Sequence, residues 1–343
     1  MPYSYGRPSI YSVTLPSLLS EAARLRAFKP PFRFTDFFSP EDTLLCVIAS
    51  EAALARARSP GASMQPGDPL RIVELTSGSG LIGIHLLRIE RHSTLLGIDI
   101  DQASTQTAKA NGEDLGVGRR ARFTREDVKS RHAESIVSRE KPHLLVCNPP
   151  YIPEPPGENL AVEAGAGPHG TAHIMRAVEI ARASKPRSVS LSWCSLSDPE
   201  QVVFCAERAG YQLNSLFITA IADGEYSGKV EGYLRELDTT FLNSNTETLH
   251  AVAPDGSASF GFLLMAGEFS RTSSGPRPAS SASKHVGTIC SRFARRGIAS
   301  LDSIEAPFAV RTWLLDRWDE VRLRAFLHGR EDESNVEAVS EAQ

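Results

Sequence analysis

The amino-acid sequence predicts an α/β fold: a Rossmann-like, mostly parallel sheet of seven strands with helices on both faces. Two observations predict it. From residue 70 onward, short apolar runs with strand character alternate with helical runs, as in right-handed βαβ units. The first apolar run also passes through a Gly-rich stretch, ELTSGSG, directly into a helical pattern. Open α/β sheets bind ligands at such strand-to-helix turns.

Each predicted strand is a short apolar run bounded by turn-forming residues. The seven strands are expected over residues 70–76, 94–100, 121–127, 143–148, 187–194, 211–221 and 260–269. Helices are expected over residues 81–91, 102–115, 172–183 and 198–209. The last helix has clear boundaries, since Asp198 can cap its start, Pro199 suits its first turn and Gly210 can end it.

Flanking segments divide the rest of the chain. Residues 1–60 are expected to form an N-terminal segment with a short helical candidate at 17–28 and a long helix that begins after Ser39. The main domain is expected over residues 61–269, with a polar insertion at 222–258 that is longer than most connections in a compact domain. The remaining expectations are a Ser/Pro-rich linker (270–285), a small helical extension (286–330) with helical spacing at 312–329, and an acidic tail (331–343).

The composition narrows the function classes. A formal net charge of −4 does not suit a chain that binds mainly through a nucleic-acid backbone, although it leaves room for a local basic patch. No apolar stretch is long enough to span a bilayer, and the N-terminal residues lack a secretory pattern. Five scattered cysteines favour a reducing cytosol and argue against a cysteine zinc site. His169 and His173 lack an evident third ligand, so we expect no metal site. Taken together, these features lead us to expect a cytoplasmic protein with no membrane association.

The stretch from Glu74 to Gly80 is the first candidate ligand site. The strand ends near Glu74, and Thr76, Ser77, Gly78 and Gly80 form the turn that opens the next helix. Such a turn lets a ligand approach the backbone closely. A carboxylate beside the turn repels phosphate and suits a cationic ligand. We therefore favour S-adenosylmethionine, which carries an ammonium and a sulfonium but no phosphate, over a dinucleotide. The alternative is a loop of small residues that only turns the chain.

Acidic residues close the next two strands. Asp99 ends the second predicted strand, where an adenosine ribose needs a hydroxyl acceptor. Asp127 follows the third, where it could accept from an adenine amino group, or could simply be a solvated acid at a strand end. Ile100 and Val128 follow these acids and, with Asn148, complete the predicted cofactor site. Because the carboxyl ends of parallel strands meet at one sheet edge, these residues are expected beside the Gly-rich turn.

The fourth predicted strand ends in Asn148-Pro149-Pro150-Tyr151. An amide or aromatic amine nitrogen is a poor nucleophile because its lone pair is delocalised. Asn148 Oδ1 and a carbonyl in the Pro149 region could accept both N–H hydrogens and aim the lone pair at a methyl donor. The prolines fix φ, and Tyr151 could offer a flat face to the planar group. We predict that these residues are catalytic; the alternative is an Asx-type turn before a Pro-rich loop.

Three motifs together carry a family resemblance. ELTSGSG (74–80), GIDID (97–101) and NPPYIP (148–153) resemble class I S-adenosylmethionine-dependent methyltransferases that act on nitrogen. NPPYIP looks most like the release-factor glutamine methyltransferases (HemK-like), which methylate a glutamine side-chain amide. The stretches at 37–54 and 164–181 are similar to that family's Pro-Glu-Thr-bearing helix and Gly-rich segment, so the likeness covers about residues 37–221.

The chain also departs from that family. Thr76 stands where the family's first glycine is expected. The N-terminal region is shorter than the family's helical release-factor-binding domain, and the loop after Pro-Pro-Tyr is shorter too. The insertion at 222–258 and the tail from residue 270 have no counterpart in the family.

The resemblance implies an enzyme that transfers a methyl group to a protein glutamine, with a release-factor-like protein as its partner. A nucleic-acid N-methyltransferase stays open as an alternative, because an exocyclic amino group of adenine or guanine presents the same planar NH2. A non-catalytic module that keeps the fold is a third hypothesis, for which Thr76 is the hint. The sequence leaves the oligomeric state open.

Overall fold

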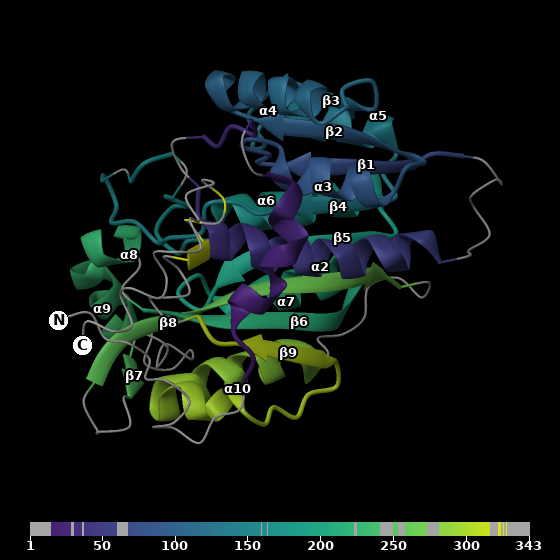
Figure 1. Ribbon diagram of the computed structural model, residues 1–343. Helices are drawn as coiled ribbons and strands as arrows, with labels where there is room; N and C mark the ends of the chain where they lie inside the picture. Colours follow the sequence, from purple (N-terminus) through teal and green to yellow (C-terminus); the bar gives the residue numbers. More distant parts are fainter. Residues whose placement is uncertain are drawn as a thin grey trace, which may run out of the picture.

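The computed structural model describes residues 15–28, 31–35, 38–59, 68–158, 160–162, 164–222, 225–240, 250–252, 258–272, 281–315, 322–323, 325 and 327. One twisted sheet runs through the molecule, and helices pack on both of its faces (Figure 1). This arrangement confirms the predicted α/β fold class.

Within the described residues the sheet has nine strands in the order β3-β2-β1-β4-β5-β8-β6-β9, with β7 paired to β8. Their bounds are β1 (Leu70–Leu75), β2 (Ser93–Asp99), β3 (Ala121–Arg125), β4 (Leu144–Cys147), β5 (Ser188–Cys194), β6 (Tyr211–Ala222), β7 (His250–Val252), β8 (Ala258–Arg271) and β9 (Ala309–Trp313). All seven predicted strands are present. Among these strands β8 alone runs against the others, since its pairings are antiparallel and the remaining ones are parallel.

The predicted count of seven strands was too low because two strands gave weak sequence signals. β7 has three residues and lies within the polar insertion. β9 lies where the predicted helix at 312–329 begins, so that prediction was wrong at its start. β9 pairs in parallel with β6, and Trp313 stacks on Phe217 with ring centroids 6.2 Å apart. Burial of this aromatic pair against the sheet decides the local structure.

Two sets of helices cover the two faces of the sheet. The first contains η1 (Leu18–Phe28, a 3-10 helix), α2 (Pro40–Arg58), α3 (Leu81–Ile89) and α4 (Gln102–Asp114). The second contains α5 (Arg131–Glu140), α6 (Ala172–Ser184), α7 (Pro199–Arg208) and α10 (Ser281–Arg296), followed by η3 (Gly297–Leu301). Alternate residues of β4 face the two sets: Leu145 and Cys147 join one apolar cluster, Leu144 and Val146 the other. No helix within the described ranges is both long and apolar enough to cross a bilayer.

Local sequence explains where several helices begin. Ser39 caps α2 as predicted, accepting a backbone N–H at 3.4 Å, and Pro40 occupies the first helical turn. The sequence analysis missed α5. Ser130 caps it, but only Ala133 and Val137 of this helix are buried, so few apolar residues mark it in the sequence.

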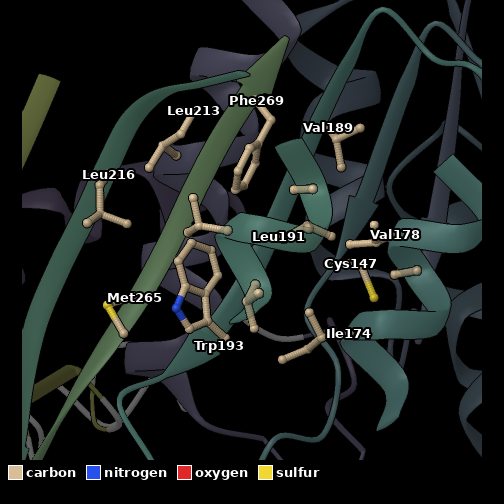
Figure 2. Packing of buried hydrophobic residues seen from close by; sticks show 14 of the residues in the cluster. Cys147, Ile174, Val178, Val189, Leu191, Trp193, Leu213, Leu216, Met265 and Phe269 are labelled. Carbon is tan, nitrogen blue, oxygen red and sulfur yellow. The ribbon is translucent and has the colours of Figure 1, made fainter. Parts of the chain in front are cut away.

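Trp193 on β5 anchors the second face of the sheet. It is fully buried and lies 6.2 Å from Phe269 of β8, measured between ring centroids. Figure 2 shows the indole beside β8, with Met265 and Leu191 nearby. A Cβ on Gly267 would lie 2.8 Å from Trp193 Cη2, so glycine on β8 makes room for the ring. This packing locks the antiparallel strand into the sheet.

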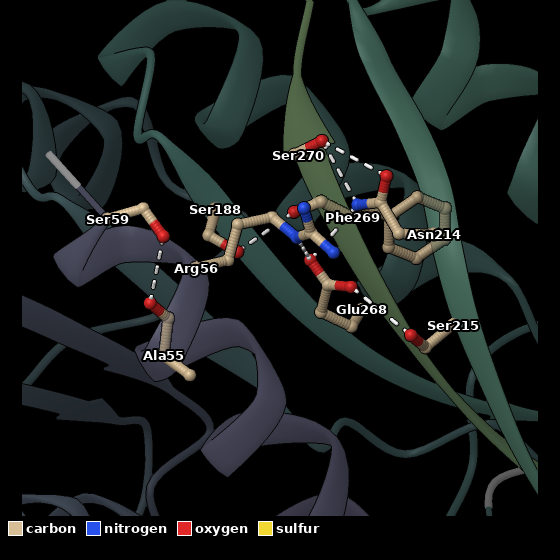
Figure 3. Close-up of polar contacts among 9 residues, drawn as sticks. All are labelled: Ala55, Arg56, Ser59, Ser188, Asn214, Ser215, Glu268, Phe269 and Ser270. Carbon is tan, nitrogen blue, oxygen red and sulfur yellow. Dashed lines mark hydrogen bonds and ion pairs between the residues drawn. The ribbon is translucent and has the colours of Figure 1, made fainter. Parts of the chain in front are cut away.

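A buried carboxylate joins α2 to the sheet on the other face. Glu268 of β8 is 1% exposed. Its Oε1 accepts from Arg56 Nε at 2.5 Å and from Asn214 Nδ2 at 3.0 Å, and Ser215 Oγ donates to Oε2 at 3.4 Å (Figure 3). These donors compensate the desolvation of the carboxylate. The network lies away from the candidate site and orients α2 on the sheet.

The insertion and the C-terminal part differ from the sequence expectations. The predicted insertion contains α8 (Glu225–Lys229), α9 (Glu231–Thr240) and β7. α10 begins at Ser281, inside the stretch predicted as a linker at 270–285. Part of the predicted helical extension is β9, a strand of the main sheet, whereas residues 322, 323, 325 and 327 are helical. The predicted acidic tail at 331–343 lies outside the described residues.

Candidate active site

The ends of β1, β2 and β4 meet at one edge of the sheet. These strands are neighbours and run parallel. Leu75, the last residue of β1, lies opposite both Ile98 of β2 and Cys147 of β4. The Gly-rich turn, Asp99 and Asn148 follow directly. The sheet therefore brings the predicted donor and acceptor segments together.

Three residues of the Gly-rich turn have left-handed backbone: Thr76 (φ 53°), Gly78 (φ 50°) and Gly80 (φ 79°). A Cβ on Gly80 would lie 2.9 Å from Cζ of Phe123, whereas the same position on Gly78 has open space around it. The open side of Gly78 is where a ligand can approach the backbone. For β-branched Thr76 the conformation costs about 1–3 kcal/mol. Thr76 nonetheless adopts the left-handed conformation that glycine favours.

Glu74 lies beneath this turn and is 2% exposed. Its Oε2 accepts the backbone N–H of Gly83 in α3 at 3.1 Å. A Cβ on Gly83 would lie 2.5 Å from that oxygen, so glycine in α3 makes room for the carboxyl group. Burial raises the pKa of Glu74 to about 8, and the nearby Asp99 adds to the rise. The sequence analysis expected an acid beside a cationic ligand; the raised pKa favours the neutral form, and the hydrogen bond to Gly83 joins α3 to β1.

Asp99 connects the end of β2 to the Gly-rich turn. Its Oδ2 accepts the backbone N–H of Gly78 at 2.7 Å, and its Oδ1 accepts that of Asp101 at 2.9 Å. Burial raises the pKa of Asp99, while these hydrogen bonds lower it. Because Gly78 is the open residue of the turn, the Asp99 carboxylate borders the space in which a ligand can sit. Asp101 caps α4, accepting from Ser104 at 2.6 Å.

The other predicted cofactor residues lie around Asp99. Ile100 is 44% exposed, so an apolar side chain is available at the rim, as a flat heterocycle requires. Asp127 is half-buried, and its Oδ1 accepts the N–H of Lys129 at 2.8 Å. Val128 is 3% exposed and belongs to the core. Its side chain therefore supports the loop from below.

Asn148 carries an unused acceptor. Its Oδ1 is buried and has no hydrogen-bond partner. Buried polar atoms in folded proteins are rarely left without a partner, so such an atom needs an explanation. The backbone oxygen of Asn148 accepts from the Thr76 hydroxyl at 3.1 Å. This bond holds Asn148 beside the Gly-rich turn, and an N–H donor from a ligand would satisfy the amide oxygen.

Asn148 and the three residues after it form the predicted acceptor motif (148–151). The residues after Asn148 are rigid. Pro149 is buried and Pro150 half-buried, and both fix φ without offering an N–H. The Tyr151 hydroxyl lies 2.6 Å from both carboxylate oxygens of Asp42, in the first turn of α2. Burial raises the pKa of Tyr151 well above 10, and Asp42 raises it further. The sequence analysis did not single out Asp42, because an acid at a helix start is usually explained by the helix dipole.

The histidines and cysteines do not form a metal centre in the part of the chain that the structure describes. No group of three or more His, Cys, Asp or Glu side chains there could hold a metal ion. Nδ1 of His173 is buried without a partner, and burial lowers the pKa of this residue. All five cysteines are free thiols.

Comparison with known proteins connects this site to methyltransferases. Residues 63–162 match the protein family Methyltransferase small domain. A release factor glutamine methyltransferase of Enterococcus faecalis is 31% identical over 91 residues, which are 26% of this chain and 30% of that protein. The Chlorobaculum tepidum protein of the same name is 31% identical over 120 residues, 34% and 40% of the two chains.

A relative with another acceptor also matches. The tRNA1(Val) (adenine(37)-N6)-methyltransferase of a Flavobacteriaceae bacterium is 25% identical over 131 residues, 38% of this chain and 52% of that protein. The chain thus spans about a third to a half of the length of these relatives.

Solved structures of methyltransferases resemble this chain more distantly. The S-adenosylmethionine-dependent methyltransferase of Geobacter sulfurreducens, in complex with S-adenosyl-L-homocysteine, is 16% identical with a TM-score of 0.38, covering 69% of this chain and 94% of that one. The corresponding Thiobacillus denitrificans protein is 14% identical with a TM-score of 0.37, covering 72% and 97%. The family match agrees with the resemblance that the motifs indicated: residues 63–162 of this chain match the methyltransferase small domain.

Proposed function

We propose that this protein is an S-adenosylmethionine-dependent N-methyltransferase whose acceptor is the side-chain amide of a protein glutamine. The observation that carries the proposal is the buried, unpartnered Oδ1 of Asn148 beside the Gly-rich turn. A glutamine NH2 bound there would donate to this oxygen. The same contact would place the nitrogen next to a methyl donor bound over Gly78.

The residues at the turn fit S-adenosylmethionine. Ser77 Oγ is buried without a partner, and Gly78 leaves open space for a close approach. The Asp99 carboxylate suits hydroxyl groups of the donor, and the exposed Ile100 suits its adenine face. S-adenosylmethionine supplies an electrophilic methyl group on a sulfonium. Glu74, buried beneath the turn, would act by positioning α3.

The acceptor residues then have to orient a weak nucleophile. Asn148 Oδ1 accepts one N–H, and a backbone carbonyl in the Pro149 region accepts the other. With both hydrogens held, the lone pair is aimed at the methyl group without a strong base. The nitrogen would form its bond to the methyl carbon as the S–CH3 bond breaks, with S-adenosylhomocysteine as the leaving group, and would lose one proton to water. Tyr151, held by Asp42, presents its ring to the planar amide.

Two observations support a protein acceptor. Relatives named release factor glutamine methyltransferase match part of this chain at 31% identity. Carboxylates also stand beside the motif, at Asp42 and Glu154, and they would repel a phosphate backbone. A nucleic-acid amino group is the second candidate, because the tRNA adenine methyltransferase matches as well. The left-handed Thr76 preserves the turn, which supports catalysis over a non-catalytic module.

The test is to incubate the purified protein with tritiated S-adenosylmethionine and either purified release factor or tRNA. We expect tritium in the protein, on a glutamine identified by mass spectrometry. Asn148→Ala is the control: it should bind the donor in calorimetry and leave the release factor unlabelled. Tritium in tRNA alone would contradict the protein acceptor and support the second candidate. A wild-type protein that does not bind the donor would contradict both.

A further inference from the structure

α8 and α9 lie at the ligand edge of the sheet. β5 and β6 both pair antiparallel with β8, so β6 runs in the same direction as β4. The last residue of β6, Ala222, therefore lies at the edge where Asn148 follows β4. The insertion leaves the sheet at this point, and Figure 1 shows α8 and α9 together at that end.

The apolar side of this helix pair packs on the segment that follows the acceptor motif. Val230, between the two helices, is 6% exposed and Leu234 of α9 is 1% exposed. They form a cluster with Ile152 and Phe262, and Tyr151 packs against it. Since Ile152 directly follows Tyr151 in the chain, the insertion packs directly against the end of the acceptor motif.

The loop after the motif has a defined shape. The Glu154 carboxylate accepts the backbone N–H of Leu160 at 2.9 Å and that of Gly167 at 3.0 Å. Ile152 also forms a parallel bridge with Gly165. These contacts fold the loop back on the acceptor motif, so the loop lies beside the position at which an acceptor would bind to Asn148.

Tyr233 joins the insertion to this loop. Its hydroxyl, on α9, donates to the backbone oxygen of Pro168 at 3.1 Å. A tyrosine hydroxyl is protonated at neutral pH and can donate this hydrogen bond. The bond is exposed. Its loss should therefore cost little folding free energy while loosening the loop.

We propose that α8 and α9 are the acceptor-recognition element of this enzyme. Through Tyr233 and the apolar cluster they hold the loop that borders the glutamine-bearing polypeptide. The inference rests on the proposed function and adds which part of the molecule selects the acceptor. In a purely structural role, the two helices would only cover the apolar end of the sheet, and small changes at Tyr233 would not alter acceptor binding.

Tyr233→Phe separates these two roles. It removes one hydroxyl and keeps the ring. We expect the KM for release factor to rise about three- to tenfold, as the loss of one hydrogen bond predicts. The kcat, the donor affinity in calorimetry and the Tm should match the wild type. Tyr211→Phe is the matched control, because the Tyr211 hydroxyl donates to Ala181 and Pro186 from the opposite end of β6. That variant should lower the Tm and leave the KM unchanged.

Leu234→Ala provides a second measurement, since it loosens the packing on Ile152. It should raise the KM for the acceptor while donor affinity stays at the wild-type value. An unchanged KM in both variants would overturn the proposal. Failure of the proposed function is seen separately, in the wild type. If tRNA is labelled instead, the KM comparison is made with tRNA and decides in the same way. If nothing is labelled, there is no acceptor to recognise and the proposal falls.

Discussion

The hydroxyl of Thr76 lies 3.1 Å from the backbone oxygen of Asn148. This contact joins the Gly-rich turn after β1 to the first residue of the acceptor motif after β4. Thr76 has a φ of 53°, and its hydroxyl is also 2.6 Å from the oxygen of Leu75. The residue that replaces an expected glycine is thus strained, but it makes a contact between the donor and acceptor segments that glycine cannot make.

Thr76→Val should reduce turnover about tenfold, because it keeps the β-branched shape and removes the hydroxyl that positions the Asn148 backbone. Donor affinity should change little. Initial rates and calorimetry measure the two quantities. Thr76→Ser keeps the hydroxyl and should restore most of the turnover. Equal losses in the valine and serine variants would show that the hydrogen bond does not position Asn148.

Asn148→Ala should cut turnover by about a hundredfold or more while leaving donor affinity nearly unchanged. The reason is that, in the proposed function, the unpartnered Oδ1 contacts the reacting nitrogen and not the donor. Single-turnover rates, with calorimetry on the same preparation, test this separation. A loss of donor affinity as large as the loss of rate would place Asn148 in the donor site.

Asp99→Ala should weaken donor binding by about tenfold or more, since hydrogen bonds to a charged group contribute about 1.5–3 kcal/mol. The Asp99 carboxylate borders the open side of Gly78, whose N–H it accepts at 2.7 Å. Calorimetry gives the affinity. Asp99→Asn controls for side-chain size and should bind more tightly than the alanine variant. An alanine variant with wild-type affinity would remove Asp99 from the cofactor site.

Glu74→Gln should change how stability depends on pH. The folded pKa of Glu74 is about 8, above the ordinary value of 4.5, so the folded state holds a proton that the unfolded state releases. The stabilisation is fully present below pH 4.5 and is lost as the pH rises through about 8. Glutamine stays neutral and can still accept from Gly83. As the pH rises between these limits, the free energy of unfolding of the variant, measured with urea, should therefore increase relative to that of the wild type. The increase is at most about 1.4 kcal/mol per pH unit. A constant difference would contradict burial of an ionisable Glu74.

Tyr151→Phe should destabilise the fold by about 1–2 kcal/mol, because it takes a hydrogen-bond donor from the buried carboxylate of Asp42. The ring, which we propose to face the acceptor, remains, so turnover should fall less than in Asn148→Ala. Urea unfolding and initial rates measure both effects. Asp42→Asn, which keeps an acceptor oxygen for Tyr151, should be more stable than Asp42→Ala. If those two variants were equally stable, the bond to Tyr151 would not account for the stability.

Much of the architecture could be predicted because its signals are local. Apolar runs, the Ser39 cap and the Gly-rich turn act within a few residues, and parallel strands bring their carboxyl ends to one edge. These rules placed Asp99 and Asn148 beside the turn. α5 escaped prediction because few of its residues are buried, and β9 because Trp313 also fits a helical spacing.

The sequence by itself thus determined the α/β fold, seven of the strands and the edge at which the candidate site lies. Only the tertiary structure decided which way individual side chains point. It buried Glu74 against Gly83, joined Tyr151 to Asp42, and packed α9 on the segment after the motif. The physical reason is that burial and hydrogen bonding between segments far apart in the chain depend on how the layers pack. Patterns over a few neighbouring residues do not determine these contacts.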